Sequence, residues 1–585
     1  MKYSVSGKMW LERLINEDIV SDIKKNLGTS DFVSRLISRN IKNIEQAEKF
    51  LYPKIKTLLP DPFHLKDMEK GVKRCMQAIL SGETICIFGD YDVDGATSSA
   101  LLKNFFDSIN VKSFIYIPDR IEEGYGPNIS AMDKIKNKNA SLVITVDCGS
   151  VSFDAIKHAV DIKLDVIVID HHISMEILPK AVAVINPNRL DETSDYTYLA
   201  AVGVTFLFLV GLSRRLKEDK FFEKNKLQLP DLIKQLDLVA LGTVCDVMPL
   251  IGLNRAFVAQ GLKVAKRRFN LGYKTLCDIA GIDSELSAYH LGFIIGPRIN
   301  AGGRVGRSDL GANLLSSKKK DYVNRVAIEL DNYNQERRAI EHMLLEDAKL
   351  QAESQLNKPM IFIIGNDWHQ GVIGIIAGRI KDKYNKPAFV LSLKNGVGKA
   401  SCRSVKGIDI GCKIIEAKQQ NLLLAGGGHA MAAGFSVSED KIDELKKFLE
   451  FECQKHIQNS QKHLEFYYDL EISTKGATHD LVNELALLEP YGVGNSTPIF
   501  KFSNLYVLKA DMIALKHAKV IFAPSKAATG SSPIYAIAFN INDTPIQKVV
   551  FNKLSKQLDV FGKLQINKWQ NVNNIQLVIE DIVEK

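Results

Sequence analysis

The segment from Ile85 to Gly95, Ile85-Cys-Ile-Phe-Gly-Asp90-Tyr-Asp92-Val-Asp94-Gly95, decides the fold and the chemistry of this chain. Its first four residues form a short apolar run that predicts a buried strand. Three aspartates follow at alternate positions, and a strand end or turn can direct their side chains to one point. Carboxylates this crowded repel one another unless divalent cations lie among them. Hard oxygen ligands favour Mg²⁺, Mn²⁺ or Ca²⁺.

An EF-hand calcium loop has the same D-x-D-x-D-G opening. That loop needs a helix before it and a glutamate at its twelfth position, whereas here a predicted strand comes first and Leu101 occupies the twelfth position. The segment therefore predicts a catalytic metal site rather than a structural calcium loop or a solvated turn.

Size and composition place the chain among ordinary soluble proteins. Its 585 residues suffice for about three or four domains, and 46% apolar with 25% charged residues is a globular composition. The net charge of +8 and a pI of about 8.8 weakly indicate a polyanionic partner. Eight cysteines without a CxxC pair favour a reduced compartment over a disulfide scaffold or a zinc site.

Two segments bear on location. The first ten residues contain no apolar core of signal-peptide length. Residues 196–213 (YTYLAAVGVTFLFLVGLS) are uncharged and long enough for a marginal membrane span. Small and hydroxyl residues interrupt this segment, and patterns of a soluble kind follow it, so we favour a helix buried within an α/β domain. We expect a cytoplasmic protein without a membrane partner.

Between about residues 80 and 190, apolar runs alternate with helical segments, as the βαβ units of a parallel sheet require. The predicted strands are 85–88, 114–117, 143–146, 166–169 and 181–185. Acids and histidines follow three of these strands, at Asp90 to Asp94, at Asp147 and at Asp170-His171-His172. Because open α/β sheets carry their active sites at the carboxyl ends of the strands, we expect these side chains to converge.

The remaining patterns divide the chain into five regions. Residues 1–80 are mainly helical, and the α/β domain covers 81–317. Residues 318–356 contain neither proline nor glycine and predict a long exposed helix that joins two lobes. Residues 357–459 form a second, smaller α/β region, and the short alternating strands of 460–585 predict a β-barrel with a helical insertion.

The predicted site combines many carboxylates with two imidazoles. It includes Asp246, in Gly242-Thr-Val-Cys-Asp246-Val-Met-Pro249. Each residue alone has an ordinary explanation as a cap or a chance neighbour of a strand, but together they suit a pair of Mn²⁺ or Mg²⁺ ions better than a lone zinc. Two such ions about 3.5–4 Å apart can hold the attacking and leaving oxygens of a phosphoester. The chain has no Walker A loop and no GxSxG motif, which disfavours nucleotide-driven motors and serine hydrolases.

The motifs resemble a known superfamily. The DHH phosphoesterase superfamily has successive motifs similar to Gly89–Gly95, Val146-Asp-Cys-Gly149, Asp170-His-His172 and Cys245-Asp-Val-Met-Pro-Leu250. Three later segments narrow the resemblance to the RecJ family of single-stranded-DNA exonucleases: Gly296-Pro-Arg-Ile-Asn-Ala-Gly-Gly-Arg304, Trp368-His-Gln-Gly-Val-Ile-Gly374 and Gly427-Gly-His-Ala-Met-Ala-Ala-Gly434. The resemblance covers nearly the whole chain, with the motifs in order. It implies a parallel-sheet DHH catalytic domain, a connecting helix, a DHH-associated α/β domain and a C-terminal OB-like barrel.

The resemblance also implies an activity: metal-dependent 5′→3′ hydrolysis of single-stranded DNA to 5′-mononucleotides, in DNA repair and recombination. The implied cofactors are two divalent cations, Mn²⁺ or Mg²⁺, and the implied ligands are Asp90, Asp92, Asp94, Asp147, His171, His172 and Asp246. Asp170 would belong to the same catalytic set by orienting its neighbours, as metal-bound histidines usually require.

Other residues of the matching motifs would hold DNA. Arginine binds phosphate in a bidentate manner, so Arg120, Arg298 and Arg304, with Asn300, are candidates for phosphate contacts. Ser401 and Arg403 could hold a terminal 5′-phosphate. By the resemblance, the same cleft would receive the side chains of His369 and Arg379 and a backbone cradle at Gly427, Gly428 and His429.

The predicted barrel supplies a second indication of nucleic-acid binding. Between Lys501 and Lys568 the chain has ten lysines against three acids, Asp511, Asp543 and Asp559. Basic residues interleaved with aromatic residues suit a single strand, and the aromatic residues here are Phe502, Tyr506, Phe522, Tyr535, Phe539, Phe551, Phe561 and Trp569. The alternative is that the lysines form a solvated face and the aromatic residues fill the barrel.

Three functions remain open from the sequence. An exonuclease acting on single-stranded DNA is favoured. A DHH phosphodiesterase for short oligonucleotides or cyclic dinucleotides would need only the two core lobes, and a non-catalytic single-strand-binding protein would not need every acid of the motif. We expect single-stranded DNA as the partner, with a single-strand-binding protein and a helicase as candidate protein partners, and a monomer.

Overall fold

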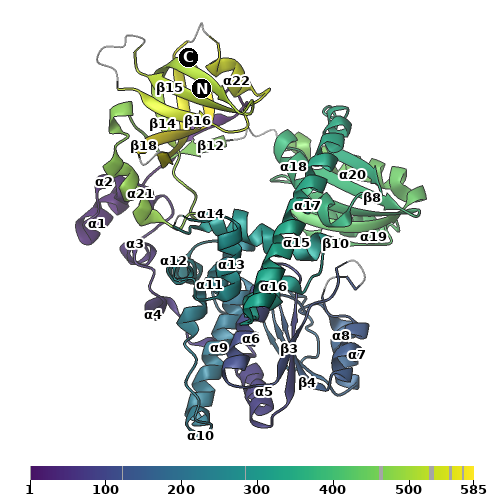
Figure 1. The fold of residues 1–585 in the computed structure, drawn as a ribbon. Helices are drawn as coiled ribbons and strands as arrows, with labels where there is room; N and C mark the ends of the chain where they lie inside the picture. The colour runs from purple at the N-terminus through teal and green to yellow at the C-terminus, as the bar shows by residue number, and fades with distance from the viewer. Residues whose placement is uncertain are drawn as a thin grey trace. The chain divides into compact units, whose positions relative to one another are not determined.

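The computed structural model describes residues 2–120, 123–124, 126–283, 285–459, 465–525, 532–552, 556–569 and 572–585 (Figure 1). The chain forms two compact units. We call Pro60–Met248 with Gly261–Lys462 the catalytic unit, and Met1–Leu59 with Pro249–Gln260 and His463–Lys585 the barrel unit.

The first sheet of the catalytic unit is parallel and has the strand order β3-β2-β4-β5-β6. Its strands are β2 (Thr84–Gly89), β3 (Ser113–Tyr116), β4 (Ala140–Val146), β5 (Asp165–Ile169) and β6 (Ala183–Ile185). All five predicted strands are therefore present, each within a few residues of its expected position.

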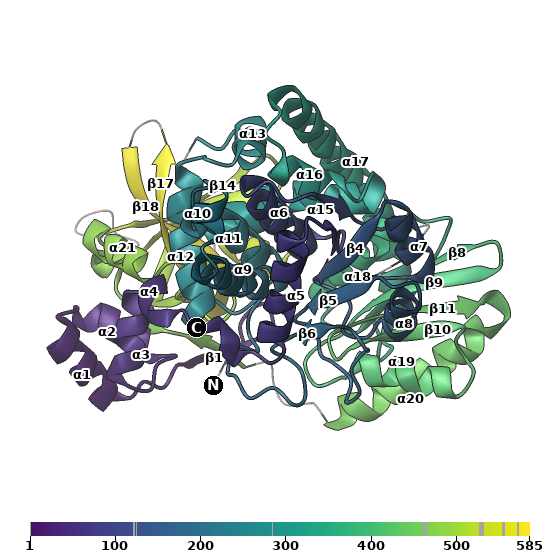
Figure 2. The same cartoon turned by 90° about the horizontal axis from the view of Figure 1, so that it is seen from below.

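Helices cover both faces of this sheet (Figure 2). On one face, α7 (Ile129–Asn137) and α8 (Phe153–Asp161) enclose an apolar layer with the strands. The other face receives α5 (Met68–Leu80), α6 (Val93–Ser108) and α9 (Ala201–Glu218). Residues of α9 up to Leu209 are buried, as predicted for the uncharged segment. Within the described part of the chain, no helix is long and apolar enough to span a membrane.

Further helices lead from the first sheet to the second. They are α10 (Phe221–Lys224), α11 (Leu236–Cys245), α12 (Gly252–Lys266), α13 (Leu271–Ile279), α14 (Ala288–His290), a π-helical turn (Leu291–Ile295), α15 (Gly296–Val305) and α16 (Leu310–Ser316). The predicted long helix is α17 (Lys320–Glu353), which buries one stripe including Val323 and Leu330.

The second sheet is mixed, with the order β10-β11-β9-β8-β7. β7 (Ile361–Asn366) and β8 (Ala388–Lys394) are parallel, and β9 (Val397–Arg403), β11 (Ala432–Ser438) and β10 (Ala425–His429) continue antiparallel. One face packs on α18 (Gln370–Tyr384), and the other on α19 (Ile410–Gln419) and α20 (Ile442–Asn459).

The barrel unit is built on a six-stranded sheet that closes through pairing of β14 with β17. The sheet consists of β13 (Leu470–Glu471), β14 (Phe500–Ile513), β15 (His517–Ala523), β16 (Ile534–Ala538), β18 (Val572–Glu584) and β17 (Leu558–Trp569). The expected helical insertion is α22 (Pro545–Val550). A separate short helix, α21 (His479–Leu485), precedes β14.

The N-terminal residues differ from the expected separate region 1–80. Strand β1 (Met9–Glu12) pairs with β12 (Glu465–Tyr468), and α1 (Glu17–Leu27), α2 (Asp31–Ser38) and α3 (Ile44–Leu51) share a core with the barrel. In that core Val33 and Leu36 lie with Phe500 and Phe502. Short amphipathic helices must bury their apolar stripe on a partner, and the helical pattern alone does not reveal that the partner lies more than 400 residues away in the sequence.

A single buried arginine ties the segment Pro249–Gln260 into the barrel unit. The Arg255 side chain is 1% exposed and donates hydrogen bonds to four backbone carbonyls. These belong to Phe50, Leu488, Glu489 and Pro490, at 2.7–3.2 Å. Nearby, the Leu250 amide donates to the Val493 carbonyl at 2.7 Å.

Candidate metal centre

The three alternate aspartates lie across the junction of β2 and α6. Asp90 follows β2, and Asp92 caps α6 by accepting a hydrogen bond from the Gly95 amide at 3.1 Å. The position of Asp94 differs from the expected one: it lies in the first turn of helix α6 and not at a strand end or in a turn. The reversal of the chain at this junction is very tight, since a Cβ on Gly95 would lie 2.4 Å from the Asp90 carbonyl oxygen. Glycine is therefore required there.

Two other segments of the site contain residues with left-handed backbone angles. Asp147, directly after β4, has φ 62°, and Val247, directly after Asp246, has φ 59°. This region is sparsely populated by residues other than glycine and is especially unfavourable for a β-branched one. Such strain concentrates at functional sites, where the surrounding structure maintains it.

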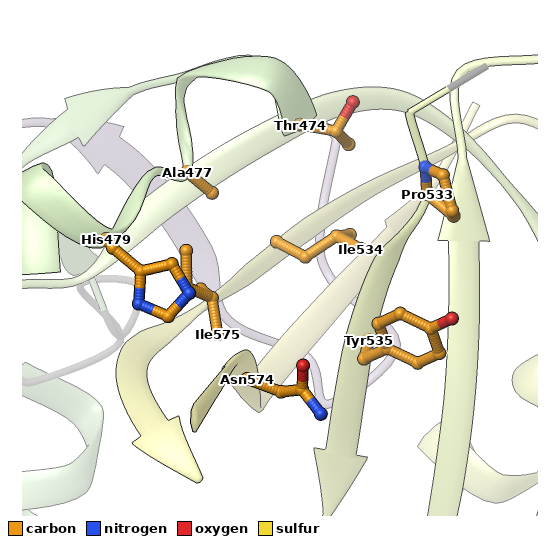
Figure 3. Close-up of a pocket in the computed structure, with 8 residues that line it drawn as sticks. All are labelled: Thr474, Ala477, His479, Pro533, Ile534, Tyr535, Asn574 and Ile575. Carbon is orange, nitrogen blue, oxygen red and sulfur yellow. The ribbon is translucent and has the colours of Figure 1, made fainter. Parts of the chain in front are cut away.

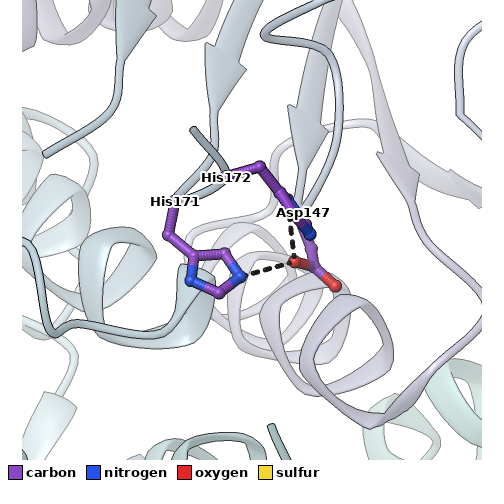
Figure 4. Close-up of side chains that lie close together, drawn as sticks. All are labelled: Asp147, His171 and His172. Carbon is purple, nitrogen blue, oxygen red and sulfur yellow. Dashed lines mark ion pairs between the residues drawn. The ribbon is translucent and has the colours of Figure 1, made fainter. Parts of the chain in front are cut away.

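His171 lies at the centre of the acids that these segments bring together. Its Nε2 atom lies 3.3 Å from Asp147 Oδ1, 3.4 Å from Asp246 Oδ2 and 3.9 Å from Asp94 Oδ2. His172 Nδ1 lies 3.9 Å from the same Asp147 oxygen (Figure 4). Segments widely separated in the sequence thus supply one compact cluster.

Three overlapping sets of side chains could each hold a metal ion. They are Asp90, Asp92 and Asp147; Asp94, His171 and Asp246; and Asp147, His171 and His172. Within each set one potential ligand atom per residue lies within 4.8 Å of the others. Asp147 and His171 each belong to two sets, so neighbouring ions could share ligands.

Asp170 holds the two histidines of the cluster in position through hydrogen bonds. Its Oδ1 atom accepts hydrogen bonds from the amides of His171 and His172, at 2.8 and 3.2 Å, and lies 2.8 Å from His172 Nδ1. Its Oδ2 atom accepts from the Ser150 amide at 3.0 Å. These contacts agree with the orienting role that the family resemblance implies for Asp170.

Asp94 is fixed by the start of α9. Its two carboxylate oxygens accept hydrogen bonds from the amides of Ala201 and Val202, at 2.6 and 2.9 Å. These amides would otherwise lack partners because the first turn of a helix has none of its own. The positive end of the helix also favours the ionised carboxylate.

Burial makes this cluster expensive to charge. Burial, reinforced by the charge of Asp92, raises the pKa of Asp94 to about 7 and the pKa values of Asp90 and Asp147 well above the ordinary value. Burial also raises the pKa of Asp246 to about 9 and lowers that of His171 to about 4. Strongly shifted pKa values that gather in one place are typical of functional sites.

The residues fit hard divalent cations. Asp90 Oδ1, His171 Nε2 and Asp246 Oδ2 are buried atoms that make no hydrogen bond among the described residues. Buried polar atoms of this kind normally have a partner. A cation would provide one and would remove the repulsion between the carboxylates. A donor set of mainly carboxylates suits Mn²⁺ or Mg²⁺.

Three of the predicted DNA-binding arginines lie near one another. Burial and the charge of Arg120 lower the pKa values of Arg304, to about 10, and of Arg403. Arg120 stacks on the ring of Tyr91, 4.9 Å from its centroid. Arg304 Nη1 donates to the Gly371 carbonyl at 2.9 Å. A cluster of guanidinium groups attracts a polyanion.

Other predicted DNA contacts are placed differently. Arg298 is committed within the protein, since it pairs with Asp331 at 2.8 Å and donates to the Ile294 carbonyl at 2.7 Å. Arg379 is exposed and pairs with Glu341 at 3.1 Å. Asn300 is half-buried on α15.

The second sheet contributes the remaining predicted contacts. Ser401 and Arg403 lie on β9, with Arg403 Nη1 3.4 Å from Ser401 Oγ. A Cβ on Gly374 of α18 would lie 2.9 Å from that hydroxyl oxygen, so this glycine lets α18 approach β9. His369 caps α18 by accepting from the Gly371 amide at 3.2 Å. Gly427, Gly428 and His429 lie on the edge strand β10.

Two asparagines that were not predicted from the sequence support the histidines. Asn186 Nδ2 donates to the His172 carbonyl and to Ser150 Oγ, each at 2.8 Å, and Asn188 Nδ2 donates to the His171 carbonyl at 2.5 Å. A signal was available, because both asparagines follow β6, at the same edge of the parallel sheet as the acids.

Of the eight aromatic residues singled out in the barrel, Tyr506 is half-buried, and those of the others whose side chains are described separate into two groups. Phe502 and Phe522 are fully buried and Phe561 is nearly so, which means that they fill the core. Tyr535, Phe539 and Phe551 are exposed, and the side chain of Trp569 lies outside the described residues. Of the ten lysines, Lys526 and Lys553, and the Lys568 side chain, also lie outside them.

Comparison with known protein families divides the chain in the same way as its sheets. Residues 84–243 match the DHH family, N-terminal domain, residues 357–455 match the DHHA1 domain, and residues 468–581 match the RecJ OB domain. The expected combination of a DHH domain, a DHH-associated domain and an OB-like barrel is confirmed.

Individual relatives are similar over most of their length. The single-stranded-DNA-specific exonuclease RecJ of Escherichia coli (strain K12) is 32% identical over 557 residues, which cover 93% of this chain and 94% of that protein. The enzyme with the same name from Bacillus subtilis (strain 168) is 31% identical over 585 residues, covering 99% and 71% respectively. A crystal structure of RecJ in complex with Mn²⁺ from Thermus thermophilus superposes with a TM-score of 0.82 at 25% identity, covering 99% of this chain and 80% of that one.

Proposed function

The chain belongs to the RecJ family, and from that premise we propose that it is a metal-dependent exonuclease that hydrolyses single-stranded DNA in the 5′→3′ direction and releases 5′-mononucleotides. We place this activity in DNA repair and recombination. The observation that carries the proposal is the buried cluster around His171, where three overlapping ligand sets share Asp147 and His171. The curated relatives are single-stranded-DNA-specific exonucleases by name.

The ligand sets would hold two Mn²⁺ or Mg²⁺ ions. Asp90 and Asp92 would serve one ion, Asp94 and Asp246 the other, and Asp147 with the two histidines would lie between them. When bound, such ions polarise the phosphodiester and lower the pKa of a water molecule. The protein orients the ligands: Asp170 fixes both histidines, Asn186 and Asn188 hold their carbonyls, and the α9 amides fix Asp94.

The arginines would position the strand beside this cluster. Arg120, Arg304 and Arg403 offer planar guanidinium groups to phosphates. Ser401 and Arg403, adjacent on β9, would hold the terminal 5′-phosphate and so set the polarity. Single-strand-binding protein and a helicase are the protein partners we propose from the family resemblance, with a monomer as the state in solution.

Replacement of the shared ligand tests the metal-dependent chemistry. Asp147→Ala should lower the rate of hydrolysis of a labelled single strand in Mn²⁺ by about 10³-fold or more, because both ion positions lose a ligand. Asp133→Ala removes an exposed aspartate of the same unit and should leave the rate unchanged. An Asp147→Ala protein with near-parental turnover would refute the proposed centre.

The polarity needs a separate measurement. A strand labelled at its 5′ end should release labelled mononucleotide from the first time points, whereas a 3′ label should stay on long fragments. Arg403→Lys should reduce the preference for a 5′-phosphate over a 5′-hydroxyl end, and Arg214→Lys, an exposed arginine on α9, should not. Early release of the 3′ label would show that the polarity is wrong.

A further inference from the structure

We propose that the barrel unit contains a pocket for a single nucleobase of the DNA strand, at the edge where β16 and β18 begin. The pocket has a volume of about 170 Å³ and is lined by Thr474, Ala477, His479, Pro533, Ile534, Tyr535, Asn574 and Ile575 (Figure 3). This inference rests on the proposed function, because the occupant is part of the same substrate.

The register of the strands creates the pocket. β16 and β18 are parallel neighbours, with Tyr535 opposite Gln576, so their first residues lie at the same end of the sheet. Ile534 is 4% exposed and belongs to the barrel core, and Ile575 packs against that core, so the two form an apolar floor. The segment from Thr474 to His479 closes the other side (Figure 3).

The lining matches a base in size and in chemistry. The volume is below the roughly 300–1,000 Å³ of pockets that hold whole drug-sized ligands, which favours a fragment such as one base. Tyr535 offers an aromatic ring at the rim, and stacking on such a ring is how proteins hold unpaired bases. The Asn574 amide has both donors and an acceptor, as the edges of bases require. Among the described residues that line the pocket there is no lysine, arginine or acid, so the lining suits the neutral base rather than the phosphate.

A surface continuous with the pocket indicates where the strand would continue. Tyr535 and Ile537 on β16 and Phe539 directly after it alternate with buried residues, and Tyr535 and Phe539 are 48% and 49% exposed. On the neighbouring strand β15, Lys519 lies opposite Ile537, and the His517 ring packs edge-on against Phe539 with 5.3 Å between centroids. We call these five residues the β16 track.

The β16 track favours a nucleic acid as the occupant. Its exposed rings lie on either side of Ile537, and the exposed Lys519, opposite Ile537 on β15, makes no ion pair among the described residues. Because Phe502 and Phe522 fill the core, Tyr535 and Phe539 are among the few barrel aromatic residues available for stacking. An apolar peptide would gain nothing from Lys519, whereas a base in the pocket places the adjoining phosphates in the solvent beside that lysine.

Binding measurements with catalysis blocked by Asp147→Ala test the pocket. A thymidine oligonucleotide and an abasic oligonucleotide of equal length carry the same phosphates but differ in bases. Tyr535→Ala should weaken binding of the thymidine strand by about 5- to 100-fold, with little effect on the abasic strand and an unchanged salt slope. Tyr535→Phe keeps the ring and should retain binding. Tyr52→Ala, which removes a tyrosine 55% exposed outside the barrel sheet, is the matched control.

A photocrosslink supplies independent evidence of contact. A strand containing 5-iodouracil should crosslink to a peptide that includes Tyr535 in the otherwise intact Asp147→Ala protein. The inference is overturned if Tyr535→Ala binds the thymidine strand within twofold of its parent, or if the crosslink maps away from the pocket. If the parental enzyme neither binds nor cleaves single strands in Mn²⁺, the proposed function fails and the inference falls with it. If the parent cleaves single strands but Tyr535→Ala binds the thymidine strand as its parent does, only the proposed base pocket is refuted and the proposed function stands.

Discussion

Replacement of Asp170 by asparagine should separate the orientation of the histidines from the ligands themselves. The carboxylate accepts three backbone hydrogen bonds and contacts His172 Nδ1, all at 2.8–3.2 Å. Asparagine has one acceptor oxygen, so if that oxygen faces the histidine amides, its NH₂ group confronts the Ser150 N–H. Hydrogen bonds to a charged group contribute about 1.5–3 kcal/mol each, and more is lost when a buried donor is left without a partner.

The loss of one such bond corresponds to a 10- to 100-fold weaker Mn²⁺ activation, which agrees with the usual effect of residues that support metal ligands. His172 should respond as well. Burial lowers its pKa, but the hydrogen bond and charge of Asp170, together with the charges of Asp246 and Asp92, outweigh burial and raise the pKa to about 9. In the metal-free Asp170→Asn protein this pKa should fall.

Two assays measure these effects: the Mn²⁺ concentration for half-maximal hydrolysis, and NMR titration of the histidines in the metal-free protein. Thermal unfolding controls for loss of structure. The reasoning is refuted if Asp170→Asn requires Mn²⁺ within threefold of the parental concentration and its His172 titrates as in the parent.

Three further predictions concern stability. Mn²⁺ at 100 times its dissociation constant should stabilise the parental protein by about 2.7 kcal/mol, and Asp147→Ala should lose most of that rise in Tm. Burial raises the pKa of Asp237 to about 7 from an ordinary 3.8. Asp237 therefore ionises at a lower pH in the unfolded chain than in the folded protein, and the stability of the folded protein falls as pH rises from about 4 to 7. Urea unfolding should show Asp237→Asn to be more stable than the parent by up to about 4 kcal/mol at pH 8 and equal to it below pH 4. Arg255→Met removes a donor from four backbone carbonyls, of which those of Leu488 and Pro490 still accept from Asn495 Nδ2, and should cost about 2 kcal/mol or more by urea unfolding, with Arg255→Lys intermediate; a loss below 1 kcal/mol would contradict that role.

Much of the catalytic unit could be predicted because its local signals agree. The apolar run before Asp90 and the runs before Asp147 and Asp170 mark strands, and parallel strands bring their carboxyl ends to one edge. That rule places side chains from distant segments together without knowledge of any contact. The same rule would have located Asn186 and Asn188, had it been applied to the strand that precedes them.

What the sequence could not decide depended on partners that no local pattern contains. The motif containing Arg298 predicts a phosphate contact, and no local pattern indicates that Asp331 of α17 pairs with this guanidinium. Likewise, alternation alone does not distinguish the buried Phe522 from the exposed Tyr535, because the closure of the sheet decides which face is inside. The position of Asp94 in a helix also depends on the precise residue at which α6 begins.

The division of the barrel unit into three stretches of chain has a consequence for biosynthesis. Residues 1–59 leave the ribosome first, but the described barrel residues of their core begin at Leu470, about 400 residues later. At roughly 5–20 residues per second this is a delay of about 20–80 s, during which α1, α2 and α3 can pack on one another but lack the barrel residues of their core. The nascent chain is therefore a natural client for chaperones over that interval. Premature termination anywhere before the barrel would leave the N-terminal helices permanently without the barrel residues of their core.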